Sequence, residues 1–155
     1  MKVGLFIGRF QPFHNGHLDA IKVILNECDL ILILIGSKQY SKTQDNPYSY
    51  EERKEMIENT LKNEGITKYK IIGLDDIHND EKWVDYLNKN SPKYDLIYTS
   101  NPGVHRLFSE KKILVKELRF NIPISGKLIR EMMKEKNEKW ENFVPNLVVE
   151  HINKL

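Results

Sequence analysis

The chain has 155 residues, of which 40% are hydrophobic and 30% are charged, and its formal net charge is +2. This composition excludes a disordered chain, and the balanced charge argues against a nucleic-acid partner. The single cysteine excludes an intramolecular disulfide framework. We therefore expect one cytoplasmic domain over residues 1–155. We expect no membrane partner, because the longest apolar run, residues 30–35, is too short to cross a bilayer.

Strand and helix patterns alternate along the chain. Apolar runs of strand length lie at residues 3–7, 30–35, 69–73, 95–98 and 113–115. Helical patterns occupy residues 18–28 and about 81–88, the segments that follow Ser49, Asn101 and Ser125, and the end of the chain from Pro145. Ser49 and Glu52 fit a capping box, and the helix after Ser125 is expected to bury Leu128, Ile129, Met132 and Met133. Such alternation predicts an α/β fold, a doubly wound parallel sheet of about five strands.

The turn between the first strand and the first helix carries the densest set of chemical groups. It comprises residues 8–17, with the sequence Gly-Arg-Phe-Gln-Pro-Phe-His-Asn-Gly-His. Unpaired backbone N–H groups and the helix dipole attract anions at such a helix start. Arg9 adds a permanent cation, His14 and His17 add imidazoles, and Gly16 lets the backbone approach a ligand closely. The turn therefore predicts a polyphosphate site.

Three other interpretations of this turn compete with a polyphosphate site. Two histidines spaced i, i+3 can bind zinc, but zinc needs further ligands, and the only cysteine, Cys28, lies on an apolar helix face. We therefore expect no metal-ligating side chains. The histidines could instead only cap and pack, and this alternative stays open. The glycine patterns of dinucleotide-binding folds and of P-loops are absent from the sequence.

Two motifs resemble a known family. The segment from His14 to His17 is similar to the His-x-Gly-His signature of the nucleotidyltransferase superfamily, and the longer segment from Gly8 resembles archaeal-type nicotinamide-nucleotide adenylyltransferases. Residues 124–130, Ile-Ser-Gly-Lys-Leu-Ile-Arg, resemble the Ser-x-x-x-x-Arg element of that superfamily. The resemblance implies a Rossmann-like fold, transfer of AMP from ATP to NMN by in-line attack with release of pyrophosphate, and assembly into homo-oligomers, which are hexamers in the family.

The resemblance also implies roles for the residues that bind ATP. His14, His17 and Arg130 would be catalytic, because they stabilise charge that develops on the transferred phosphate. Ser125 and the helix that it begins would hold the β- and γ-phosphates, which Arg9 and Arg130 would neutralise. The other expected ATP contacts are Gly8, Phe10, Gly16, Asn101 and Gly126. Mg²⁺ would enter with ATP, since it binds phosphate oxygens and needs few protein ligands.

A second group of residues is assigned to NMN by the same resemblance. Arg53 ends a segment similar to the family's Asn-Pro-Phe-Thr-Ala-Gly-Glu-Arg, whose arginine contacts substrate phosphate. Asp76 and Trp83 resemble an Asp-Ile and Trp-Val pair, in which the indole stacks on the nicotinamide ring in a cation–π contact worth about 1 kcal/mol. The alternatives are a surface salt bridge for Arg53, core packing for Trp83 and a plain helix cap for Asn101.

Three departures from the family pattern concern the substrate. Lys127 replaces a threonine, Lys42 stands where the family has histidine, and Tyr50-Glu51 replace Ala-Gly. A related adenylyltransferase that uses pantetheine phosphate or FMN therefore remains an alternative. A non-catalytic nucleotide-binding module is the alternative from a different functional class.

Overall fold

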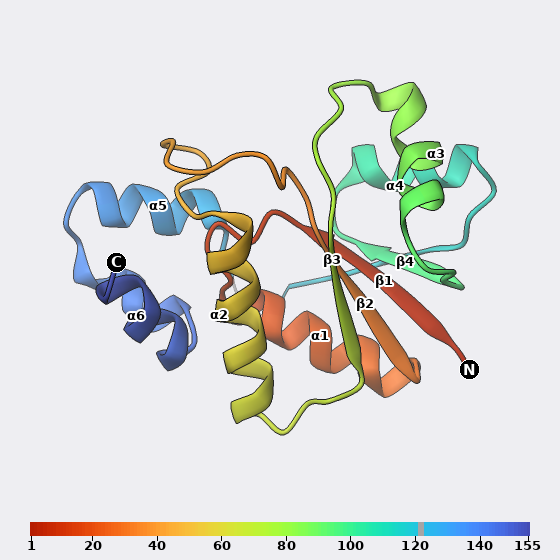
Figure 1. The fold of residues 1–155 in the computed structure, drawn as a ribbon. Coiled ribbons are helices and arrows are strands. Elements are labelled where there is room, and N and C mark those ends of the chain that lie inside the picture. Colours follow the sequence, from red (N-terminus) through yellow and green to blue (C-terminus); the bar gives the residue numbers. More distant parts are fainter. Residues whose placement is uncertain (121–122) are drawn as a thin grey trace. The chain divides into compact units, whose positions relative to one another are not determined.

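The computed structural model describes residues 1–120 and 123–155. In chain order its elements are β1 (Val3–Gly8), α1 (Asn15–Glu27), β2 (Leu30–Ile35), α2 (Tyr50–Asn63), β3 (Tyr69–Gly73), α3 (Asp80–Asn90), β4 (Leu96–Thr99), α4 (Pro102–Glu110), β5 (Val115–Glu117), α5 (Gly126–Lys134), the 3-10 helix η1 (Glu138–Phe143) and α6 (Asn146–Asn153) (Figure 1). The strands form one parallel sheet in the order β3-β2-β1-β4-β5. The predicted doubly wound α/β fold is confirmed.

The chain forms two compact units. The first, the sheet unit, comprises Met1–Gly8, Ile21–Lys38 and Lys68–Arg119, and it holds all five strands with α3, α4 and the second half of α1. The second, the helical unit, comprises residues 9–20 and 39–67 and the described residues from 120 to 155. It holds the start of α1 with α2, α5, η1 and α6.

The core of the sheet unit explains why its strands were predictable. Strand β2 pairs with β1 on one side and β3 on the other, and five of its six residues are buried, so its sequence is apolar without alternation. Buried side chains of the strands pack with α3 and α4 on one face of the sheet; they are Leu5, Leu32, Leu34 and Ile97, with Val84, Leu87 and Phe108 from the helices. Figure 1 shows α3 and α4 side by side.

The opposite face of the sheet is covered by α1. A Cβ atom added at Gly4 of β1 would lie 3.0 Å from Ile24 of α1 and 3.0 Å from Tyr98 of β4. The Tyr98 hydroxyl donates to Glu27 Oε2 at 2.6 Å, which ties the end of α1 to β4. Helices therefore cover both faces of the parallel sheet, as its two-sided burial requires.

The last strand differs from the predicted segment 113–115. Pairing with β4 begins at Val115 and continues to Glu117. The Ile113 N–H donates to the Phe108 carbonyl at the end of α4, and Leu114 is 65% exposed. Ile113 thus closes α4, whereas the Leu114 carbonyl accepts from the Ile97 N–H of β4 at 3.0 Å. The edge strand itself carries Lys116 and Glu117, because an edge tolerates charged residues.

The helical unit confirms the predicted helix starts and corrects one predicted burial. Ser49 and Glu52 form the expected capping box of α2, and Ser125 caps α5. The expectation that Leu128, Ile129, Met132 and Met133 form one buried face of α5 is wrong, because only Ile129 is buried and Leu128 is 38% exposed. Met132 and Met133 are half-buried. Helix η1, which buries Trp140, was not predicted, because its sequence Glu-Lys-Trp-Glu-Asn-Phe has no helical apolar stripe.

Candidate active site

The loop after β1 makes its turn at a bulky residue. Phe10 has φ 55, a left-handed conformation that is uncommon for residues other than glycine and that stores strain. Its buried ring lies 5.9 Å from the Phe13 ring and 4.7 Å, edge-on, from the His17 ring. Aromatic packing therefore holds the strained turn and places His17 beside it.

His14 and His17 form a stacked pair. Their ring centroids lie 3.5 Å apart with an interplanar angle of 18°. The backbone N–H of His14 donates to Nδ1 of His17 at 3.1 Å, and the backbone N–H of His17 donates to Nδ1 of His14 at 3.3 Å. Because each Nδ1 accepts a hydrogen bond, each neutral ring carries its hydrogen on Nε2. The loop thus builds two Nε2–H donors.

Both imidazoles are neutral near pH 7. Burial lowers the pKa of His14 from 6.5 to about 4. Burial also lowers the pKa of His17, and the neighbouring His14 lowers it further. Desolvation disfavours the charged form, and two imidazolium rings in contact would repel each other. The pair therefore supplies hydrogen bonds to a ligand rather than positive charge.

Gly16 is required by the position of His14. A Cβ atom at residue 16 would lie 3.0 Å from His14 Cε1 and 3.1 Å from His14 Nδ1. Any side chain there would push against the ring whose Nδ1 accepts the His17 N–H. Crowding by an imidazole is thus a reason for this glycine in the His-x-Gly-His motif, alongside close approach to a ligand.

Arg53 is buried beneath the loop. Its exposure is 0%, its Nε donates to the Ser49 carbonyl at 3.1 Å, and its Nη1 donates to the Arg9 carbonyl at 2.9 Å. The surface salt bridge considered for Arg53 is therefore wrong. Burial lowers its pKa to about 10, and the charge of Arg9 contributes to the shift. The guanidinium still stays protonated at neutral pH and fixes the backbone of Arg9.

The start of α5 lies against the same loop. Arg130 Nη1 donates to the Gln11 carbonyl at 2.8 Å, and a Cβ atom at Gly126 would lie 3.3 Å from that carbonyl oxygen. Ser125 Oγ accepts from the Leu128 N–H at 3.1 Å, as an N-cap does. The two motifs, which lie more than 100 residues apart in the chain, therefore meet in the helical unit. Glycine at position 126 is what allows the close approach.

Three guanidinium groups gather at this loop. Arg9 is exposed, and its Nη1 donates to Asn46 Oδ1 at 3.3 Å. Burial and the charge of Arg9 lower the pKa values of both Arg53 and Arg130, so the three groups lie within electrostatic range. An anion between them would relieve this repulsion, and an arginine fork matches phosphate oxygens. The predicted polyphosphate site thus has its cations, two neutral donors and a helix start in one unit.

Two residues of the site were not predicted. Gln11 is 2% exposed, and its side-chain amide donates to the Tyr48 carbonyl and accepts from the Tyr48 N–H, both at 2.9 Å. This pair fixes the loop before α2 to the loop after β1. A glutamine between two phenylalanines was the available signal, because a polar side chain in an aromatic stretch is buried only with partners.

The remaining four predicted residues lie in the sheet unit. Gly8 ends β1, and its carbonyl accepts from Gly36 at 2.9 Å. Asp76 and Asn101 follow the carboxyl ends of β3 and β4, the edge where parallel sheets carry ligands, and β1 and β4 flank the point where strand order reverses. Asp76 Oδ1 accepts from the His78 N–H, and Asn101 Oδ1 caps α4.

Trp83 has a packing role in the sheet unit. Its half-buried ring stands edge-on to Phe108, with centroids 5.6 Å apart and an angle of 88°. It also contacts the apolar cluster under α3 and α4. Part of the Trp83 ring is therefore used in core packing, and its contact with nicotinamide stays a prediction.

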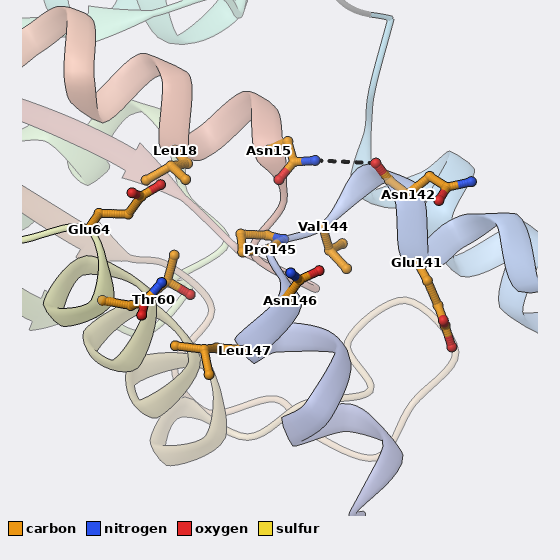
Figure 2. A pocket seen from close by; sticks show the side chains of 11 residues that line it. Asn15, Leu18, Thr60, Glu64, Glu141, Asn142, Val144, Pro145, Asn146 and Leu147 are labelled. Atoms are coloured by element: carbon orange, nitrogen blue, oxygen red, sulfur yellow. Dashed lines mark hydrogen bonds between the residues drawn. The ribbon is translucent and has the colours of Figure 1, made fainter.

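The described residues of the helical unit line at least two hollows. One, of about 480 Å³, is lined by Arg130 and neighbouring residues of α5 and of the loop before α2. The other, of about 430 Å³, is polar and lies between α1, α2 and the start of α6 (Figure 2). Asn15 Nδ2 donates to the Asn142 carbonyl at 3.3 Å on its border. None of the predicted site residues lines this second hollow.

Two searches of the described residues bear on cofactors and membranes. Residues 1–120 and 123–155 contain no group of three or more histidine, cysteine, aspartate or glutamate side chains arranged to hold a metal ion. Within the same ranges, every helix is too short or too polar to span a bilayer.

Known proteins similar to this chain come from the family that the two motifs resemble. Residues 5–132 match the family model described as cytidylyltransferase-like. The nicotinamide-nucleotide adenylyltransferase of Thermoplasma acidophilum is 45% identical over 99% of this chain and 87% of that protein. The enzyme of that name from Pyrococcus furiosus is 39% identical over the whole chain and 85% of that protein.

Solved structures agree. A bifunctional NMN adenylyltransferase/ADP ribose pyrophosphatase from Francisella tularensis, complexed with AMP and a manganese ion, superposes with a TM-score of 0.76 at 33% identity, over 86% of this chain and 42% of that one. A putative nicotinate-nucleotide adenylyltransferase from Vibrio parahaemolyticus shares the fold, with a TM-score of 0.67 at 17% identity, over 98% of this chain and 99% of that one. The family resemblance predicted from the two motifs is confirmed. The chain belongs to the cytidylyltransferase-like family, among the nicotinamide-nucleotide adenylyltransferases.

Proposed function

We propose that this chain transfers AMP from ATP to NMN, giving NAD and pyrophosphate. The observation that carries the proposal is that two neutral Nε2–H imidazoles, three guanidinium groups and the start of α5 gather on one loop. Its relatives of 39% and 45% identity are named for this activity. The arrangement suits phosphoryl chemistry, in which alignment and charge stabilisation supply most of the catalysis.

The reaction needs no enzyme nucleophile. A phosphate oxygen of NMN attacks the α-phosphorus of ATP, the bond from that phosphorus to the β-bridging oxygen breaks, and pyrophosphate leaves with the electron pair. His14 and His17 donate hydrogen bonds from Nε2 to the oxygens of the α-phosphate as charge develops there. Their Nδ1 atoms already accept backbone N–H groups, so neither ring acts as a base through that atom.

The β- and γ-phosphates are assigned to α5. Ser125, the backbone N–H groups at Gly126 and Arg130 hold them, and Arg9 adds charge from the loop. Backbone at Gly8, Phe10 and Gly16, and Asn101 in the sheet unit, complete the proposed ATP contacts. The donors gathered at the loop are arginines and neutral imidazoles, so Mg²⁺ arrives as part of the substrate, bound to the phosphate oxygens of ATP.

Arg53, Asp76 and Trp83 are assigned to NMN. Because the Arg53 guanidinium is buried and bonded to the Arg9 carbonyl, we expect it to act on the NMN phosphate through its charge and through the position of Arg9. Trp83 would offer its indole face to the cationic nicotinamide ring. Asp76, at the carboxyl edge of the sheet, would accept hydrogen bonds from the same substrate.

The proposal also covers the domain organisation, the localisation and the assembly of the chain. Residues 1–155 would act as a single nucleotidyltransferase domain in the cytoplasm, assembled as a homo-oligomer, with a hexamer expected. Light scattering on the purified protein measures the assembly. A monomer at micromolar concentration would contradict that part of the proposal.

The activity is tested with purified protein, MgATP and one acceptor at a time: NMN, FMN or pantetheine phosphate. We expect NAD and an equal amount of pyrophosphate with NMN, and neither from a His14→Ala, His17→Ala double variant. If another acceptor is turned over and NMN is not, the assignment of NMN as the acceptor is wrong. If the protein binds ATP but releases no pyrophosphate with any of the three acceptors, the proposed catalysis is wrong and a nucleotide-binding module is favoured.

A further inference from the structure

The strained loop after β1 is anchored on both sides of Phe10. Before it, the Arg9 carbonyl accepts from Arg53 Nη1 at 2.9 Å. After it, the Gln11 carbonyl accepts from Arg130 Nη1 at 2.8 Å. A left-handed conformation at a bulky residue, such as φ 55 at Phe10, persists only where the surrounding structure holds it. The side chain of Gln11 is a further anchor of this turn.

The Gln11 amide pairs with the backbone of one residue. Its Nε2 donates to the Tyr48 carbonyl and its Oε1 accepts from the Tyr48 N–H, both at 2.9 Å. Gln11 is 2% exposed, so little water competes for these two bonds. A carboxylate of the same length has no hydrogen to donate to the carbonyl, and an asparagine amide is one methylene shorter. The pairing therefore uses the length and both polar atoms of the glutamine.

Tyr48 is itself held from two sides. Its side chain is buried, and its hydroxyl donates to Met133 Sδ of α5 at 3.5 Å. The next residue, Ser49, caps α2 and forms a capping box with Glu52. The Gln11 side chain thus ties the strained loop to a segment that is bonded to both α2 and α5.

The strained turn packs directly against the imidazole pair, which is His14 and His17. The Phe10 ring stands edge-on to His17 with centroids 4.7 Å apart, and the Phe13 ring stacks on His17 at 5.6 Å. His17 stacks in turn on His14 at 3.5 Å. Because these rings are in contact, a change in the Phe10 backbone would move a ring that supports the imidazole pair.

We propose that Gln11 is a positioning residue for the imidazole pair. By pairing with Tyr48, it keeps Phe10 in the left-handed conformation, and the packed Phe10 ring then fixes the two Nε2–H donors. The effect on catalysis rests on the proposed function, whereas the effect on the imidazoles does not. Both amide atoms of Gln11 are used by Tyr48, so Gln11 acts on the reaction through alignment. A misplacement of about 1 Å can lower a rate about 10²-fold.

The test uses the whole chain with two substitutions at Gln11. Gln11→Met has a similar length but no amide, and Gln11→Asn keeps an amide that is too short to reach both groups of Tyr48. Thr60→Val is the matched control, because Thr60 is a buried polar residue of the same unit, and its hydroxyl donates to the Met56 carbonyl at 2.8 Å. Circular dichroism shows whether each variant is folded.

The first readout is the ring ¹H–¹⁵N NMR spectrum of the histidines near neutral pH, recorded without nucleotide. It reports which ring nitrogen carries the hydrogen. We expect the wild type and Thr60→Val to show His14 and His17 with the hydrogen on Nε2. In both Gln11 variants the signals of these two rings should shift or broaden, whereas those of the exposed His105 should stay unchanged.

The second readout is steady-state kinetics with NMN and MgATP. Gln11→Met should lower kcat about 10–100-fold and Gln11→Asn should lower it less, while both KM values stay within about threefold, because the substrate contacts remain. Thr60→Val should keep the wild-type kcat. Unchanged histidine signals in folded Gln11 variants, an unchanged kcat, or equal changes in Thr60→Val would overturn the inference. Unfolding of both Gln11 variants would make the residue structural and would also overturn it.

The two readouts separate this inference from the proposed function. If the wild type forms NAD and the Gln11 variants keep its histidine signals and kcat, the positioning role is wrong and the function stands. If the histidine signals depend on Gln11 but the wild type forms no NAD, the function is wrong and the positioning of the imidazoles stands.

Discussion

The two units of the chain bury different kinds of side chain. In the sheet unit, the buried side chains among the described residues are hydrophobic. In the described part of the helical unit, by contrast, four polar or charged residues are buried: Gln11, His14, Arg53 and Thr60. Burying such groups costs free energy unless they find partners. The apolar core of the sheet unit therefore contributes stability, whereas the helical unit loses stability by burying the polar groups that hold a charged loop in one conformation.

The largest effect should follow from removing a donor of the imidazole pair. His17→Ala removes an Nε2–H donor and should lower kcat by about 10²–10³-fold, as loss of one oxyanion donor does. Steady-state kinetics with NMN and MgATP measures the loss. His105→Ala, which removes an exposed histidine of α4 outside the proposed site, is the matched control and should leave kcat unchanged. Unfolding of His17→Ala at the assay temperature, instead of a folded and inactive protein, would make the residue structural.

Acid should destabilise the helical unit through His14. Its pKa is about 4 in the folded protein and 6.5 when exposed, so the unfolded chain binds the proton first as pH falls. The stabilisation is complete above about pH 6.5 and is lost by about pH 4, and it amounts to about 3 kcal/mol. Urea unfolding at several pH values measures it. His14→Gln should reduce the slope between these pH values, with the remainder due to the buried His17, and an unchanged slope would refute the assignment.

Loss of the buried guanidinium should affect stability and NMN use together. Arg53→Met leaves the Arg9 carbonyl without its side-chain donor and removes one of the two donors to the Ser49 carbonyl, so it should destabilise the protein by about 2 kcal/mol. Arg53→Lys keeps the charge but not the fork, so it should recover part of that stability while its KM for NMN stays raised. If Arg53→Met is as stable as the wild type, the position of the Arg9 backbone does not depend on the Arg53 guanidinium.

The smallest effect is expected at Trp83 in the sheet unit. Trp83→Phe keeps an aromatic ring against Phe108 but offers a weaker face to a cation, so KM for NMN should rise about fivefold while KM for ATP stays constant. Tyr86→Phe, on the same helix, is the control. Equal changes in both KM values would assign Trp83 to packing alone.

Much of the fold was predictable because local sequence determines it. The run at 30–35 coincides with β2, and the caps at Ser49, Asn101 and Ser125 begin α2, α4 and α5. Strand β5 begins two residues later than predicted, because the apolar Ile113 belongs to the end of a helix. Local pattern does not distinguish these two uses of an apolar residue.

The sequence predicts a set of site residues but not their contacts. The resemblance of the two motifs to a known family is what assigns His14, His17 and Arg130 to the proposed site. The acceptor role of each Nδ1 and the bonds of Gln11 to Tyr48, 37 residues away, depend on tertiary structure. Burial of Arg53 was missed for the same reason, since an arginine on a polar helix is usually exposed.

The most direct test of the central claim is a crystal structure with magnesium and an ATP analogue that cannot be cleaved between its α- and β-phosphates. We predict that Nε2 of His14 and of His17 lie within hydrogen-bond distance of α-phosphate oxygens, while Ser125 and Arg130 contact the β- and γ-phosphates of the same molecule. A triphosphate bound at the polar hollow of Figure 2, or held by Arg130 with both imidazoles turned away from it, would contradict the account.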